Sequence, residues 1–165
     1  MKPIIREIII TVLLAVVIFM AIRTVAHNFE VSGNSMEPNL RNGEFVIVSK
    51  IAYWFGDPER GDIVVYYTDK LKHDVIHRVV GLPGETVEIK SGEVYINGDK
   101  LDEPYISKSY RAVPSHKVPE GNYYIIGDNR NIASWEIVPE EDIVGKGWVC
   151  YWPLKEWGSV PNYSW

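Results

Sequence analysis

Cysteine is nearly absent from this chain of 165 residues, in which Cys150 is the only one. A single cysteine excludes an internal disulfide. Its neighbours from Trp148 to Trp152 are apolar and include no basic group that would stabilise a thiolate, so we expect Cys150 to be packed in a core. The four histidines form no cluster with cysteine, which argues against a zinc site, and we expect neither a metal nor another cofactor.

Positive charge is also scarce. The 17 lysines and arginines are outnumbered by 22 aspartates and glutamates, which gives a formal net charge of −5. A chain without a basic surface has no electrostatic footprint for nucleic acid, and we exclude nucleic acid as a partner. Internal repeats and low-complexity tracts are missing as well. The length suits one compact domain with an appendage.

One long apolar run stands near the N-terminus. Between Arg6 and Arg23 the chain reads EIIITVLLAVVIFMAI, which as a helix would extend about 24 Å, short of the ~30 Å hydrocarbon core of a bilayer. The apolar Ile4 and Ile5 and snorkelling of the two arginines can cover the difference. The alternative is a cleaved signal peptide with its cleavage site at residues 24–26, although Arg23 would then stand directly before that site.

The basic residues before this run favour a cytoplasmic N-terminus. We therefore predict a single-pass protein of the plasma membrane in which residues 1–27 form a cytoplasmic tip and a transmembrane anchor. Residues 28–165 would form an extracytoplasmic domain that carries out the chemistry.

Beyond Arg23 the pattern becomes extended. Short β-branched and aromatic runs are separated by Gly, Pro, Asn and Asp, at residues 45–48, 63–67, 75–80, 87–90, 94–96, 123–126 and 143–151. Asn97-Gly98 predicts a type I′ hairpin, and Ser91-Gly92 marks another turn. The fold class is therefore mainly β, with packed antiparallel sheets behind a membrane helix. Residues 102–119 are predicted to be an insertion or flap.

A candidate nucleophile lies in the stretch VSGNSMEPNL at residues 31–40. Ser35 follows Gly33 and Asn34 and precedes Pro38, so its hydroxyl can project from a kinked, exposed backbone. A serine in such a turn is more often a turn residue than a nucleophile, and it would need a nearby base.

The candidate base is His77. Strand alternation places it on one face with Val75 and Val79, and places Arg78 on the other face. A core histidine bonded to the backbone is the structural alternative. Lys70 and Lys72 are weaker candidates, because a lysine base must have its pKa lowered by about 3 units and their polar surroundings would not do this.

Four segments resemble the ordered motifs of type I signal peptidases. They are SMEP at residues 35–38, RGDIVV at 60–65, HRVVGLPGE at 77–85 and PEGNYYIIGDNR at 119–130. The resemblance implies a membrane-bound serine endopeptidase that removes signal peptides from exported preproteins after small residues, in an Ala-x-Ala pattern. Its partners would be these signal peptides, the lipid bilayer and the export machinery. By the same resemblance, Ser35 attacks the scissile carbonyl and its own N–H contributes to the oxyanion hole.

The chain departs from this family in three respects. His77 stands where most bacterial members have lysine, so we predict a Ser–His arrangement whose activity falls as the pH drops through the histidine pKa, nominally ~6.5. The segment after Arg130 is shortened, which leaves three candidates for an acidic partner: Asp128, Glu136 and Asp142. Around the serine, Asn39 replaces the usual threonine and Gly33 offers no hydroxyl to the oxyanion hole.

The oxyanion hole and substrate cleft therefore need other residues. The resemblance points to Ser32, or to backbone groups, for the second donor, and to Asn129 in the segment that would shape the site. Met36 either lines the cleft or packs beneath the nucleophile.

Two other functions are compatible with parts of the pattern. A self-cleaving repressor-type protease would share the β domain and the serine, but it would use lysine as its base and have no membrane span. A catalytically inactive, membrane-tethered β domain could bind exported peptides by strand addition.

Overall fold

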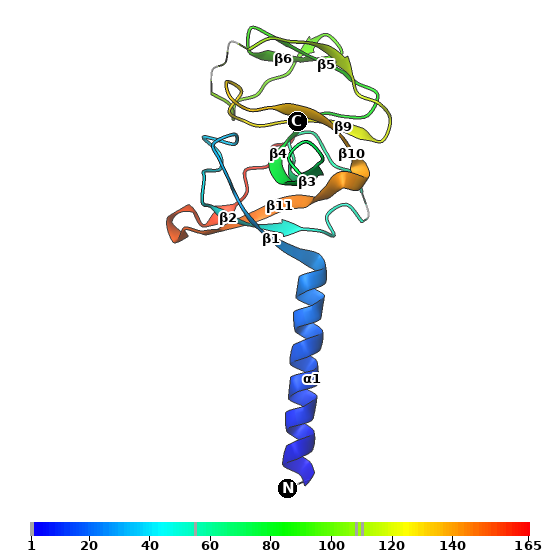
Figure 1. Ribbon diagram of the computed structural model, residues 1–165, viewed down its shortest axis with the longest axis vertical. Coiled ribbons are helices and arrows are strands. Elements are labelled where there is room, and N and C mark those ends of the chain that lie inside the picture. The colour runs from blue at the N-terminus through cyan, green and yellow to red at the C-terminus, as the bar shows by residue number, and fades with distance from the viewer. Residues whose placement is uncertain (1, 55, 108, 110) are drawn as a thin grey trace.

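A long N-terminal helix runs directly into a β-structured body in the computed structural model (Figure 1). The structure describes residues 2–54, 56–107, 109 and 111–165. Residue 1 of the predicted anchor, and residues 108 and 110 of the predicted insertion, lie outside the described residues.

Helix α1 (Lys2–Val25) carries the apolar run. Its segment Ile4–Val25 has 22 residues, which corresponds to about 33 Å and is long enough to span a hydrocarbon core of ~30 Å. The span exceeds the predicted sixteen residues because the helix continues through Arg6 and Arg23. Side chains from Ile4 to Thr24 are exposed around the whole helix, a pattern that suits lipid rather than water. Among the described residues this is the one helix long and apolar enough to cross a membrane.

The larger sheet has eight strands. Its strands β1, β2 and β11 lie at the end of the body that adjoins the helix (Figure 1). All of its pairs are antiparallel, in the order β1-β2-β11-β3-β4-β9-β10, with β12 beside β11. Its strands are β1 (Ala26–Glu30), β2 (Phe45–Ser49), β3 (Ile63–Thr68), β4 (His73–Gly81), β9 (Asn122–Ile126), β10 (Trp135–Pro139), β11 (Ile143–Trp152) and β12 (Gly158–Ser159). Two short 3-10 helices follow β10 and β11, namely η1 (Glu140–Asp142) and η2 (Leu154–Glu156).

The smaller sheet lies at the opposite end of the body from the helix (Figure 1). Its four antiparallel strands are ordered β7-β6-β5-β8. They are β5 (Thr86–Lys90), β6 (Glu93–Ile96), β7 (Asp99–Lys100) and β8 (Val113–Lys117). The stretch 102–119, predicted as an insertion or flap, thus contributes the strand β8, which pairs with β5.

The predicted fold class, mainly β with packed antiparallel sheets, is confirmed. All seven predicted strand segments are strands, because β-branched and aromatic residues fit a pleated surface that is buried on at least one face. The strands that the pattern did not reveal include β1, β8 and β10, whose sequences AHNFE, VPSHK and WEIVP contain polar residues or proline. The β propensity of these segments is weak, and they are strands because their backbones pair with neighbouring strands.

Two tight turns in the smaller sheet follow from their sequences. Ser91 and Gly92 have φ of 49° and 83°, and Asn97 and Gly98 have φ of 54° and 95°. Positive φ at both central residues is the mark of the type I′ turn, which matches the twist of the strands it joins. The predicted type I′ hairpin at Asn97-Gly98 therefore forms between β6 and β7.

Apolar side chains gather in three core clusters. One cluster packs Met36 and Leu40, from the predicted nucleophile segment, against β2, β3 and β11. Cys150 belongs to the same cluster and is buried, as predicted, and burial raises the pKa of its thiol. The second cluster joins the two sheets, and the third lies around Tyr66, Val79 and Ile125.

The C-terminal segment closes over the start of β3 at Gly61. The Tyr163 N–H donates to the Gly61 carbonyl oxygen at 3.2 Å, and Arg78 Nη1 donates to the same oxygen at 2.8 Å. Gly61 has φ +94°, and a Cβ at this position would overlap the carbonyl of Tyr163. Only glycine fits here without moving the tail.

We predict that Gly61→Ala destabilises the fold by about 2–4 kcal/mol, because the added methyl group meets both an unfavourable φ and the backbone of the tail. Gly98→Ala is the matched control, since Gly98 has φ +95° but its added methyl group would have no other atom within 4 Å. That substitution is expected to cost about 1 kcal/mol. Thermal unfolding of both variants in one detergent measures the difference, and equal unfolding midpoints would contradict the prediction.

Candidate active site

Strands β3 and β4 form a hairpin that brings polar side chains onto one buried face. In its register Val64 lies opposite His77, and Tyr66 lies opposite Val75. Residues directly opposite in an antiparallel pair share a face, and those two positions further along are diagonal neighbours. His77 and Tyr66 are therefore diagonal neighbours on one face, where His77 is 3% exposed.

The loop that carries Ser35 is held from two sides. The N–H of Asn129 donates to the Ser35 carbonyl oxygen at 2.8 Å, and its Nδ2 donates to the Asn34 carbonyl oxygen at 3.1 Å. On the other side the Gly33 N–H donates to Asn42 Oδ1 at 2.8 Å. The fully buried Met36 anchors the loop in the core. These contacts fix the backbone and leave the Ser35 hydroxyl free to face the cavity.

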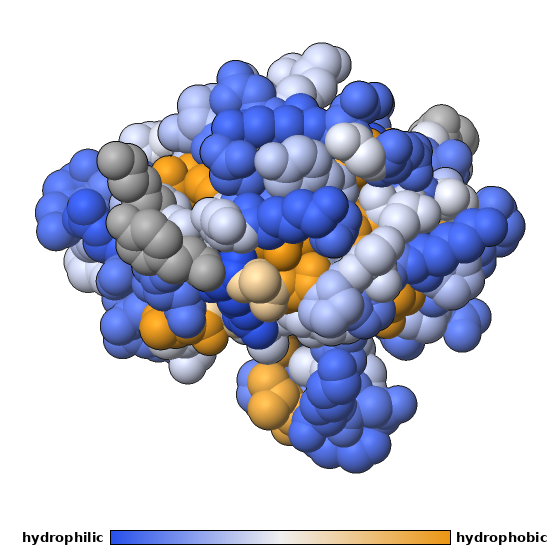
Figure 2. All heavy atoms as spheres, turned by 90° about the horizontal axis from the view of Figure 1, so that it is seen from above, coloured by the Kyte–Doolittle hydropathy of each residue, from blue (hydrophilic) through white to orange (hydrophobic). Residues whose placement is uncertain are grey.

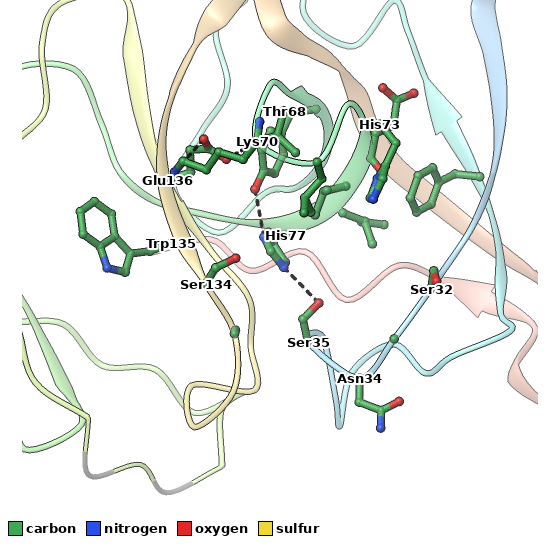
Figure 3. Close-up of a pocket in the computed structure, with 18 of the residues that line it drawn as sticks. Ser32, Asn34, Ser35, Thr68, Lys70, His73, His77, Ser134, Trp135 and Glu136 are labelled. Carbon is green, nitrogen blue, oxygen red and sulfur yellow. Dashed lines mark hydrogen bonds and ion pairs between the residues drawn. The ribbon is translucent and has the colours of Figure 1, made fainter.

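Ser35 Oγ lies 3.0 Å from His77 Nε2 (Figure 3). The two residues, 42 positions apart in sequence, thus meet at hydrogen-bond distance. Gly127 makes room for this meeting, because a Cβ there would lie 2.5 Å from the Ser35 carbonyl oxygen and 3.0 Å from His77 Cδ2. The geometry suits proton transfer from a hydroxyl to an imidazole.

The Ser35–His77 pair opens into a cavity of about 620 Å³. One wall comes from β1 and the Ser35 loop, another from β3 and β4, and a third from the segment that leads into β10. The lining residues are Phe29, Glu30, Ser32, Gly33, Asn34, Ser35, Tyr66, Thr68, Lys70, Leu71, residues 73–77 and residues 132–136. Figure 3 shows Ser134 on the wall beside His77, with its hydroxyl turned toward the imidazole.

Burial changes the basicity of His77. It lowers the pKa from its ordinary 6.5 to about 4, and the negative charges of Asp128 and Glu136 oppose this shift. The imidazole is therefore neutral, and able to accept a proton, throughout the neutral range. The expected loss of activity near pH 6.5 moves to about pH 4, because the sequence did not reveal how deeply the ring is buried.

None of the three candidate carboxylates touches the second ring nitrogen of His77. Asp128 receives two hydrogen bonds from Arg78, at 2.8 and 2.7 Å, and one from Asn39 Nδ2 at 2.8 Å. Glu136 lines the cavity, but its oxygens bond Thr68 Oγ1 at 2.8 Å and Lys70 Nζ at 2.9 Å. Asp142 lies in η1 and is not one of the described residues that line the cavity.

The partner of His77 Nδ1 is the hydroxyl of Tyr66, at 3.1 Å. Sequence reasoning missed this residue. The signal was present in the alternation of residues 63–68, which places Val64, Tyr66 and Thr68 on one face, together with the short turn that pairs this run with the His77 strand. The sequence analysis considered only carboxylates as partners of His77.

The three residues assigned to the oxyanion hole and cleft lie in different places. Ser32 is exposed and lines the cavity. Asn129 is not part of the lining and holds the backbone of the Ser35 loop. Met36 is 0% exposed, packs in a core cluster and is not among the residues that line the cavity. Among the described residues, no group of three His, Cys, Asp or Glu side chains could hold a metal ion.

Comparison with known proteins gives consistent results. The model of the family described as "Signal peptidase, peptidase S26" matches residues 4–152. The chain is 42% identical to the probable signal peptidase I-2 of Synechocystis sp., over 92% of this chain and 75% of the relative. It is 41% identical to the signal peptidase I of Leptolyngbya laminosa, over 93% of this chain and 84% of the relative.

One less similar relative covers the chain equally well, and a solved structure covers about half of it. The signal peptidase IB of Staphylococcus aureus is 33% identical, over 94% of both chains. A crystal structure of a signal peptidase I from Enterococcus faecalis is 30% identical, with a TM-score of 0.47 over 55% of this chain and 96% of that chain. The family match spans the anchor, the Ser35 loop and the His77 strand, and the chain therefore belongs to the signal peptidase family, peptidase S26.

Proposed function

We propose that this protein is a membrane-bound serine endopeptidase that removes signal peptides from exported preproteins, with Ser35 as nucleophile and His77 as general base. The observation that carries the proposal is the 3.0 Å separation of Ser35 Oγ and His77 Nε2 in a chain of the signal peptidase family. Cleavage follows small side chains in an Ala-x-Ala pattern. The curated relatives are themselves called signal peptidases, which does not favour an inactive peptide-binding domain.

The chemistry follows from the neutral imidazole. His77 Nε2 takes the hydroxyl proton as Ser35 Oγ attacks the scissile carbonyl, and the resulting imidazolium gives that proton to the leaving amine. The ester left on Ser35 is then hydrolysed by water, which His77 activates in the same way. Because the pKa of His77 is lowered to about 4, the base form is present without further tuning.

The oxyanion of each tetrahedral intermediate needs donors at the mouth of the Ser35 loop. The Ser35 N–H is one donor. The second is the exposed Ser32 hydroxyl or a backbone N–H of the same loop, since Gly33 has no side chain to offer.

The substrate binds as an extended strand. Pairing between β4 and β9 covers residues 78–81 of β4, while residues 73–77 line the cavity together with Phe29 and Glu30 of β1. Backbone groups of two strands therefore border the cavity, an arrangement suited to strand addition. The preference for small side chains would be set by the residues that line the cavity beside Ser35, and Tyr66 and Ile76 are among its bulkier lining residues.

The anchor gives the protein a defined membrane topology. Residues 1–27 form the cytoplasmic tip and anchor, and residues 28–165 form the extracytoplasmic catalytic domain. Strand β11 lies at the end of the body near the helix (Figure 1). It carries the exposed Trp148 and Trp152, and the exposed Trp157 follows it in the chain. Tryptophan favours the lipid headgroup region. The face away from the helix is largely hydrophilic (Figure 2). The bilayer and the export machinery are the expected partners.

Substitution of either reacting group tests the chemistry. Ser35→Ala and His77→Ala are each expected to lower the rate of preprotein processing by about 10³-fold or more, because the nucleophile and its base act as a unit. The assay uses detergent-solubilised full-length protein and a preprotein with Ala-x-Ala before its cleavage site. Ser115→Ala on β8 is the control and should process normally. Equal processing by all four proteins would remove the proposed function.

Topology is tested by labelling intact cells with a membrane-impermeant maleimide. In a Cys150→Ser background, cysteine at the exposed Glu93 of the small sheet should be labelled from outside. Cysteine at Lys2 should be labelled only after lysis. The reverse pattern would contradict the orientation.

The pH profile tests the burial of His77. The acid limb of kcat/KM is expected near pH 4, below the ordinary histidine value of 6.5, since the folded state resists protonation of the ring. The same shift affects the stability of the fold. The contribution of the neutral, buried His77 to the free energy of unfolding is complete above pH 6.5 and is lost progressively as the pH falls from 6.5 to 4. The unfolding midpoint must therefore be measured at each pH. A limb centred at 6.5 in folded protein would count against a buried neutral base.

A further inference from the structure

The ring nitrogen of His77 that faces away from Ser35, Nδ1, has its own hydrogen-bond partner. It lies 3.1 Å from the Tyr66 hydroxyl, where a Ser–His–Asp protease would have a carboxylate. We propose that Tyr66 is a positioning residue whose hydroxyl oxygen accepts the Nδ1 proton and so leaves Nε2 unprotonated toward Ser35. The proposal rests on the proposed function of the Ser35–His77 pair.

The backbone makes this contact a fixed feature of the fold. Tyr66 and His77 are diagonal neighbours on adjacent strands, both are at most 3% exposed, and their ring centroids are 6.0 Å apart at 45°. A rigid two-stranded frame holds the two rings at constant separation. The imidazole is thereby bonded at both nitrogens, to Tyr66 on one side and to Ser35 on the other.

The competing carboxylates are engaged elsewhere. Asp128 is bound by Arg78 on the reverse face of β4, and Glu136 is bound by Thr68 and Lys70. Tyr66 is therefore the one residue at hydrogen-bond distance from Nδ1 in the described part of the chain.

A hydroxyl can donate as well as accept, so the direction of the bond needs a cause. Burial raises the pKa of Tyr66, and the negative charge of Glu136 raises it further, so the phenol keeps its proton. A hydroxyl dipole turns its proton toward a negative charge, and this leaves its oxygen lone pairs for the Nδ1 proton. Figure 3 shows Thr68, Lys70 and Glu136 together on the side of His77 away from Ser35.

The remaining charges around the ring favour the imidazolium that forms when His77 accepts the serine proton. Asp128 and Glu136 both favour positive charge on His77, and Asp128 is itself paired with Arg78. His73 and Asp74 lie at the start of β4, in the cavity wall. When His77 takes the serine proton, its Nδ1–H keeps an acceptor in Tyr66, so the imidazolium stays hydrogen-bonded at both nitrogens.

Removing the hydroxyl tests the role. Tyr66→Phe should lower kcat about 10- to 100-fold and leave KM within about twofold, because the substrate does not bind the hydroxyl but the correct tautomer is no longer held. Tyr124→Phe is the matched control: Tyr124 is also buried, and among the described residues its hydroxyl is the buried side-chain group without a hydrogen-bond partner. A kcat for Tyr66→Phe equal to that of Tyr124→Phe would overturn the proposal, as would a change confined to KM.

A spectroscopic measurement on the unmodified protein makes the test independent of folding in the variant. With ¹⁵N-labelled histidine in the full-length protein, the His77 signals are assigned by their loss in His77→Ala. At about pH 7 the Nδ1 shift should be that of a protonated nitrogen, and the Nε2 shift that of an unprotonated one. Protonated Nε2 would overturn the proposal. Tyr66→Phe should move both shifts toward intermediate values, whereas Tyr124→Phe should not.

The two proposals fail in different ways. If His77→Ala processes preprotein at the normal rate, the proposed function fails. If His77→Ala is inactive while Tyr66→Phe keeps full kcat and the parent tautomer, the general base stands and only the role of Tyr66 is lost.

Discussion

Alternation along β4 is the constraint on which the active site depends. His77 points into the cavity, and Arg78, the next residue, points to the other side of the sheet. Arg78 is 0% exposed, and its guanidinium bonds Asp128 and the carbonyl oxygens of Gly61 and Pro161. A buried charge is tolerated only when it is paired in this way. A register shift of one residue would leave that charge unpaired and turn the imidazole away from Ser35.

The same network reaches the nucleophile from the reverse face. Asp128 accepts hydrogen bonds from Arg78 and from Asn39, four residues after Ser35. The next residue, Asn129, holds the carbonyl oxygen of Ser35. Asn39 thus has a partner in this network. The turn at residues 127–130 connects the base strand to the serine loop.

A histidine base makes a different demand on the protein than a lysine base would. The pKa of a lysine must fall by about 3 units before it can act as a base at neutral pH. Burial of an imidazole instead holds its pKa well below neutral pH, so the ring is already unprotonated. A neutral base of this kind can be oriented by a hydroxyl, and Tyr66 offers one at Nδ1. The chemistry is then consistent with a site in which Asp128 and Glu136 influence His77 through their charge and not by direct contact.

The sequence by itself determined the apolar N-terminal helix, seven of the strands, the type I′ turn at Asn97-Gly98 and the family, because each is encoded in local pattern or in ordered motifs. It also selected Ser35 and His77 as candidates. Tertiary structure decided the rest: the distance between them, the burial that lowers the pKa of His77, the core position of Met36, and the Tyr66 hydroxyl at the second ring nitrogen of His77. These features depend on strand register and on how loops distant in sequence pack together, and neither is written in any single stretch of residues.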